Sequence, residues 1–183
     1  MKRTALLFVI FISLIAKGQE TSNELTSVFR INALNPGLEL ETPISMKSTL
    51  SINSGIGIHG SNKNLNITTT GVTYFISPFV DLAYKKIYNR KNRDLKGKTL
   101  DYNSGNFWSL RLLTSFKEFK SKNIYRYDDI SFEFGPTWGI QRAYNKMHLL
   151  FDVGPAYYFD TKGNSGFFPF MIQLNIGFNV KNW

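Results

Sequence analysis

The chain contains no cysteine and only two histidines among its 183 residues. Without cysteine it can form neither a disulfide framework nor a thiolate metal site. The two histidines, His59 and His148, are too few for a three-histidine metal site. We therefore expect no metal centre of these kinds, and we expect no cofactor.

Charged residues are also scarce, at 19%, whereas aromatic residues reach 15%. A typical globular protein carries about 25% charged residues, and a disordered chain has few large apolar side chains, so the composition excludes disorder. The mean hydropathy of −0.18 argues against a helical membrane protein with several spans. The length leaves room for one domain of ordinary size.

A membrane-spanning helix needs about 20 consecutive apolar residues, and the chain has no apolar run of that length. The apolar run Ala5–Ile15 has eleven residues, follows two basic residues and is followed by Ala16-Lys17-Gly18. This order of basic, apolar and small residues is typical of a secretory signal peptide. We expect residues 1–18 to be a cleaved signal peptide and residues 19–183 to form one mature domain.

In the mature domain, apolar and polar residues alternate along most of the chain. Near the C-terminus, Ile172, Leu174 and Ile176 alternate with Gln173 and Asn175. A period of two places these two sets on opposite faces of a strand. The same test predicts eight strands and no convincing helix. The predicted strands cover residues 29–33, 38–44, 50–58, 72–84, 108–117, 130–141, 147–159 and 168–180.

The chemistry of the two faces indicates where the strands lie. Most predicted strands have the length of about 9–11 residues or more that a membrane-spanning strand needs, whereas soluble strands average about 5–6. Aromatic residues near the ends of the apolar runs predict interfacial girdles: Phe29, Tyr84, Trp108, Phe116, Phe159 and Phe168. The polar face is rich in small residues and holds isolated charges that we expect to pair in a narrow interior: Arg30, Glu39, Glu41, Asp81, Arg111, Glu133 and Asp152.

These observations predict an all-β fold, an eight-stranded antiparallel transmembrane β-barrel after a cleaved N-terminal signal peptide. The pattern resembles the small outer-membrane β-barrel proteins of the OmpA/OmpX type, and the resemblance covers essentially the whole mature chain. It implies a cell outer-membrane location, a periplasmic C-terminus, and outer-membrane lipids and the barrel-assembly machinery as partners of a monomer. It also implies an assembly signal in the final strand, at Phe178, Val180 and Trp183.

The same topology assigns the connections to two sides of the membrane. Four would be extracellular: Asn35–Gly37, His59–Asn66, Glu118–Asp129 and Asp160–Gly166. The periplasmic connection Lys85–Ser104 is unusually long and rich in basic residues. It could bind anionic lipid or a partner, but we expect a solvated, partly mobile connection, because runs of charge are usually solvated.

Three prolines fall inside predicted strands, at Pro78, Pro136 and Pro155. A closed sheet has no free edge, so we expect each of them at a bulge or near a rim, where a missing N–H does not break the ladder.

Few residues point to chemistry. Residues 55–60 match G-x-G-x-x-G, but no helix is predicted to follow, so we do not expect a nucleotide site. His148 could join Ser131 and Glu133 of the preceding strand in a catalytic group, but no nucleophile signature is present. We expect His148 to be buried and satisfied by hydrogen bonds.

The predicted function is a structural or surface-interaction role, without enzyme activity, for a barrel with a plugged polar interior. An unknown ligand or protein would bind at the extracellular loops, and nucleic acid is not expected as a partner of an exported protein. A lipid-A-modifying barrel enzyme and a soluble secreted ligand-binding β-barrel are the alternatives.

Overall fold

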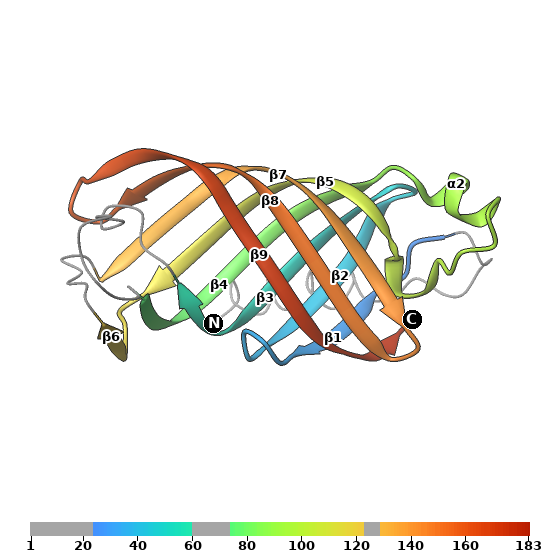
Figure 1. The fold of residues 1–183 in the computed structure, drawn as a ribbon, viewed down its shortest axis with the longest axis horizontal. Coiled ribbons are helices and arrows are strands. Elements are labelled where there is room, and N and C mark those ends of the chain that lie inside the picture. The colour runs from blue at the N-terminus through green and yellow to red at the C-terminus, as the bar shows by residue number, and fades with distance from the viewer. Residues whose placement is uncertain (1–23, 60–73, 123–128) are drawn as a thin grey trace, which may run out of the picture.

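The strands of the protein form a closed ring. The computed structural model describes residues 24–59, 74–122 and 129–183. Within these ranges the antiparallel strand order is β3-β2-β1-β9-β8-β7-β5-β4, and β4 pairs back onto β3, as Figure 1 shows. The ring strands are β1 (Val28–Asn32), β2 (Gly37–Ser45), β3 (Ser48–His59), β4 (Tyr74–Ile87), β5 (Gly105–Phe116), β7 (Ile130–Tyr144), β8 (Met147–Asp160) and β9 (Ser165–Asn182).

The eight strands predicted from alternation are therefore confirmed, in a ring-like, all-β arrangement. A short additional strand, β6 (Lys120–Lys122), pairs with β4 beyond the end of β5. The predicted signal peptide, residues 1–18, lies outside the described residues, as do parts of two predicted extracellular loops, residues 60–66 and 123–128.

The expectation of no helix was wrong for the connection between β4 and β5. This connection contains α2 (Arg90–Asp94) and the 3-10 helix η1 (Asp101–Asn103). Both are too short for an apolar period of 3.6 residues to be visible in the sequence. We call residues 88–104, which hold both helices, the cap, because they lie at one end of the ring (Figure 1).

No helix in the described ranges has both the length and the apolar character needed to cross a membrane.

Side chains alternate between the inside and the outside of the ring, and the two faces differ in polarity. On β9, Ile172 is 63% exposed, whereas Asn175 is 1% exposed. The same contrast runs around the ring, where isoleucine, leucine and aromatic side chains cover the outside. Most of the buried residues are polar or charged, which is the reverse of the distribution in an ordinary soluble protein.

Two Gly-Pro pairs bring β7 and β8 close together in the middle of the sheet. Gly135-Pro136 lies opposite Gly154-Pro155, and a Cβ atom on either glycine would overlap the carbonyl oxygen of the facing proline. Pro155 sits at a register shift between β8 and β9, as expected, and Pro78 lies one residue beyond the β4–β5 pairing. Pro136 lies at neither a bulge nor a rim, because it pairs in register with β5. The missing N–H groups coincide with the gap in the β7–β8 pairing.

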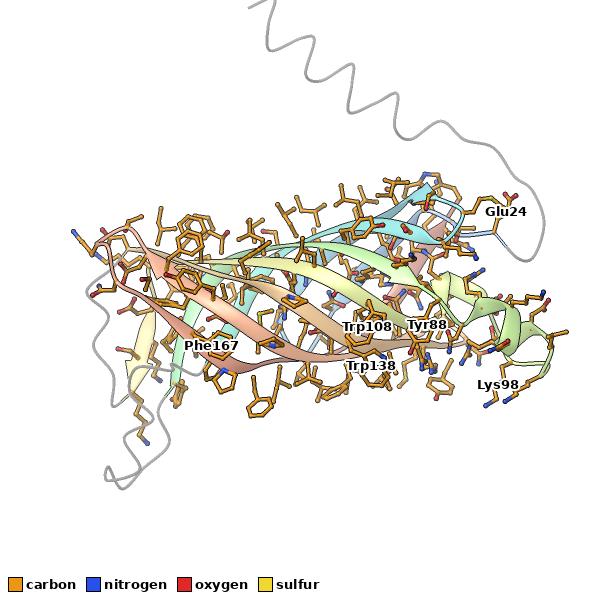
Figure 2. All side chains as sticks on the ribbon, turned by 90° about the horizontal axis from the view of Figure 1, so that it is seen from above. Glu24, Tyr88, Lys98, Trp108, Trp138 and Phe167 are labelled. Atoms are coloured by element: carbon orange, nitrogen blue, oxygen red, sulfur yellow. The ribbon has the colours of Figure 1, made fainter. Side chains whose placement is uncertain are left out.

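A bulge in β9 changes the phase of its first residues. The partners of Gly154 and Ala156 are Met171 and Phe168, so β9 holds one residue more than β8 between these pairs. Phe168 therefore shares the inward phase of Ala156, and its predicted place on the outer face was wrong. Phe167, which is 71% exposed and labelled in Figure 2, takes that outer position.

Candidate functional site

A cluster of buried charges fills the interior at the end of the ring that carries the cap. The Nη1 atom of Arg30 donates to Glu39 Oε1 at 2.9 Å and to Glu41 Oε2 at 2.6 Å, and its Nε donates to Asn179 Oδ1 at 2.9 Å. Lys85 Nζ lies 3.3 Å from Glu39 Oε1 and 3.6 Å from Glu41 Oε2. We call Arg30, Glu39, Glu41 and Lys85 the first cluster, in which two cations balance two carboxylates.

The geometry of the sheet brings these groups together. Glu39 and Glu41 are two residues apart on β2, so both point inward. Arg30 on β1 pairs directly with Glu39, and Lys85 reaches the same carboxylates from β4. Charges removed from water cost several kcal/mol each unless they are paired and hydrogen-bonded, so this arrangement offsets the cost of burying four of them.

A second cluster lies further along the interior. Arg111 Nε donates to both carboxylate oxygens of Asp81, at 2.9 and 3.0 Å, and Arg111 Nη1 lies 3.6 Å from Asp152 Oδ1. Gln173 donates to Asp81 Oδ2 at 3.3 Å, and Glu133 lies within electrostatic range of Arg111. The seven charges that the alternation assigned to the interior thus separate into two groups.

The cap closes over the first cluster. Tyr102 and Asn103 have positive φ angles, of 50° and 62°, which non-glycine residues rarely adopt. This conformation directs the carbonyl of Tyr102 at Arg30 Nη2, 3.1 Å away, and at Gln141 Nε2, 3.3 Å away. Asn103 Nδ2 donates to Glu41 Oε1 at 3.2 Å. These bonds to the interior charges compensate for the unusual backbone conformation.

The expectation of a solvated, mobile basic connection was wrong for Lys85, its first residue, and for Arg90. Lys85 lies within β4, two residues before its end, faces inward and is 3% exposed. Arg90 is buried and donates to the backbone carbonyls of Glu24 and Leu100 at 2.9 and 3.0 Å. Burial lowers the pKa of the Arg90 and Arg93 guanidiniums from the ordinary value. Arg90 thus ties the cap to the segment that precedes β1, and together with Arg93 it also bonds to carbonyl groups within the cap.

Lys85 of the first cluster, and the amide side chains that contact the cluster, were missed by sequence reasoning. Gln141 donates to Glu41 and accepts from Lys85, while Asn103 and Asn179 supply further amide contacts. Their signal in the sequence is weak. Lys85 continues the odd-numbered phase of Asp81, and Gln141 and Asn179 lie in polar phases, but nothing in the sequence marks Asn103.

His148 is buried, as predicted, but the prediction that hydrogen bonds satisfy its ring nitrogens was wrong. Its ring is 1% exposed, and neither ring nitrogen has a hydrogen-bond partner among the described residues. His148 pairs with Ala143, whereas Ser131 pairs with Asp160 at the far end of β8, about 40 Å away at 3.3 Å per residue. Glu133 is only two residues nearer. In the described part of the chain, His148 therefore has neither of these groups within reach.

The predicted assembly-signal residues lie at the end of β9. Phe178 and Val180 point outward and are 56% and 50% exposed. Trp183 extends the pairing beyond Asn182, because its N–H donates to the carbonyl of Ser27 at 3.0 Å and its carbonyl accepts from the N–H of Ser27 at 2.9 Å. Its role in assembly stays a prediction.

In the described ranges, no group of three or more His, Asp or Glu side chains is arranged so that it could hold a metal ion. No protein-family model, curated protein or solved structure matches the chain. Its function must therefore be inferred from the distribution of apolar and charged side chains on the ring itself.

Proposed function

We propose that this chain is an exported outer-membrane protein and that its ring is an eight-stranded transmembrane β-barrel, as in the small barrel proteins that its sequence pattern resembles. The apolar outer face is the observation that carries this proposal. Exposed isoleucine, leucine and phenylalanine side chains surround the ring, while its interior holds charged and amide groups. Hydrocarbon would cover that outer face, at a gain of about 25 cal/mol for each Å² of apolar surface removed from water.

Aromatic side chains near the cap support a membrane boundary there. Trp108 pairs directly with Trp138 across β5 and β7. Trp138 Nε1 donates to the hydroxyl of Tyr88 at 2.9 Å, and the three rings lie together on the outer surface in Figure 2. Tryptophan and tyrosine favour the interface between hydrocarbon and water, since they have an apolar ring and a polar tip.

Aromatic side chains also gather toward the other end of the ring. The rings of Phe132 and Phe159 stack with their centroids 4.9 Å apart, and Tyr157 and Phe167 are exposed nearby in the pairing of β8 with its neighbours. Two aromatic bands separated by an aliphatic one match the outward face of a membrane barrel.

The filled interior favours a structural or surface-interaction role over transport. An eight-stranded barrel is only wide enough for side chains to fill it, and here two charge clusters lie in the interior and the cap closes over the first of them. The cap end would face the periplasm, and the connections at the opposite end would meet an extracellular ligand or protein. Outer-membrane lipids and the barrel-assembly machinery would be the other partners of this monomer.

Fractionation of cells that express the full chain tests the proposal. We expect the protein in the outer-membrane fraction, soluble only with detergent, and with a gel mobility that changes on heating. A protein that stays soluble without detergent would refute the membrane barrel and favour a secreted, soluble one. In planar bilayers, conductance comparable to that of a general porin would refute the closed interior.

A further inference from the structure

A pocket of about 310 Å³ lies where the cap meets β5 and β7. Among the residues that the structure describes, three asparagines and four basic residues line it, and no carboxylate does. The basic residues are Arg93, Lys96, Lys98 and Arg142. The charge of this pocket is therefore strongly positive and is not balanced within its own walls.

In the part of the chain that the structure describes, the two arginines of the pocket have no anionic partner. Arg93 donates to the carbonyl of Thr99 at 2.8 Å, and Arg142 donates to the carbonyl of Gly105 at 2.7 Å. Among the described residues, neither guanidinium forms an ion pair with a carboxylate, and the two are close enough to repel each other. Holding two like charges side by side is unfavourable, and an anion between them would reverse the sign of that interaction.

Two asparagines of the pocket are set up as donors. Asn89 Oδ1 accepts the backbone N–H of Asn106 at 2.7 Å, and Asn106 Oδ1 accepts from Arg142 Nη2 at 2.6 Å. The carbonyl oxygens of both amides are thus engaged, which leaves their NH₂ groups to donate. Guanidinium, ammonium and amide groups together offer N–H donors that suit an oxyanion with several acceptor oxygens.

The pocket lies beside the outer aromatic group formed by Tyr88, Trp108 and Trp138, which marks the proposed membrane boundary. Asn89 directly follows Tyr88, whose hydroxyl accepts from Trp138 in the outer aromatic group. Lys98 projects from the cap beyond that group, as Figure 2 shows. We propose that the pocket binds a phosphate group, either in a phospholipid headgroup or in a free phosphate-bearing solute. The site itself does not depend on the proposed membrane location, whereas the headgroup source does.

The test uses the full chain purified in detergent and freed of lipid. One arm adds phosphatidylglycerol to the micelles and counts bound lipid by native mass spectrometry. The other arm adds inorganic phosphate and follows binding by the line width of its phosphorus NMR signal. The variant K96Q/K98Q removes two exposed cations from the pocket. The matched control K120Q/K122Q removes two exposed cations from β6, away from the cap.

We expect K96Q/K98Q to weaken binding roughly thirtyfold, since each lysine near a phosphate-rich surface contributes a factor of about five, and K120Q/K122Q to match the wild type. A selective loss in the lipid arm alone assigns the site to a headgroup, and a selective loss in the phosphate arm assigns it to free phosphate. Equal behaviour of the two variants in both arms, or no binding by the wild type in either, would overturn the proposal. A soluble, non-membrane chain would still give a result in the phosphate arm.

Discussion

Replacing Glu41 with glutamine tests whether the buried charges stabilise the ring as a balanced group. The carboxylate is fully buried and contacts Arg30 at 2.6 Å and Lys85 at 3.6 Å. Glutamine keeps the shape of the side chain but removes its charge. Two buried cations then face a single carboxylate, that of Glu39, and the glutamine NH₂ group competes with the guanidinium as a second donor.

The expected loss is large compared with the stability of a small domain. Breaking a buried ion pair by removing one partner costs about 3–5 kcal/mol, because the other charge remains buried without compensation. Domains are stable by only about 5–15 kcal/mol. The double variant E41Q/K85Q restores the balance of charge, so its loss should fall short of the sum of the two single losses by about 1–3 kcal/mol.

Urea unfolding of the refolded protein in lipid vesicles, followed by tryptophan fluorescence, measures these losses. A control is D129N, which removes an exposed carboxylate 3.5 Å from Lys117 and should change the free energy of unfolding little. A loss below about 1 kcal/mol for E41Q, or strict additivity in the double variant, would show that the first cluster does not act as a unit.

Three further changes probe other parts of the chain. Gly135→Ala should abolish the heat-modifiable folded form, because the new Cβ would overlap the backbone of β8, while Gly166→Ala, with open space around it, should fold normally. Asp160 loses a little solvation, which raises its pKa, but hydrogen bonds from Asn164 and its neighbours outweigh this and hold the pKa below the ordinary value. The charged form therefore stabilises the hairpin of β8 and β9 above about pH 4, and this contribution is lost as the pH falls through the lowered pKa. Asp160→Asn should therefore cost more stability at pH 7 than at pH 2, and an equal loss at both would contradict this. Leu174→Arg, midway along the outer face of β9, should cost about 2–4 kcal/mol in vesicles, and a neutral effect there would count against a lipid-facing surface.

The strands could be predicted from the sequence because alternation is a direct consequence of strand geometry. Ile172, Leu174 and Asn175 each follow the face that their parity assigns. The assignment of Phe168 failed because a single extra residue in β9 reverses the parity on one side of it. A bulge leaves no mark in a pattern that remains rich in phenylalanine throughout.

The interior could be predicted in part. Charges inside strands, such as Arg30 and Glu39, were recognisable since each interrupts an otherwise small and neutral face. Lys85 was not, because it lies where a strand continues into a basic connection and looks like the first residue of that connection. The contacts of Asn103 depend on a backbone conformation with positive φ, which nothing in the local sequence requires.

The pairing of the first strand with the last has a consequence for how the ring forms. Arg30 and Asn179, which are bonded across this seam, are separated by 149 positions in the chain. Bringing such distant segments together costs on the order of 4 kcal/mol in loop entropy before any contact repays it, and folds dominated by distant contacts form slowly. Until β9 is in place, β1 and β8 each present an unpaired edge that can bind another chain. The pairing of β9 with both neighbours thus removes both open edges at once, and a molecule truncated before β9 would remain an open sheet with two edges free to bind another chain.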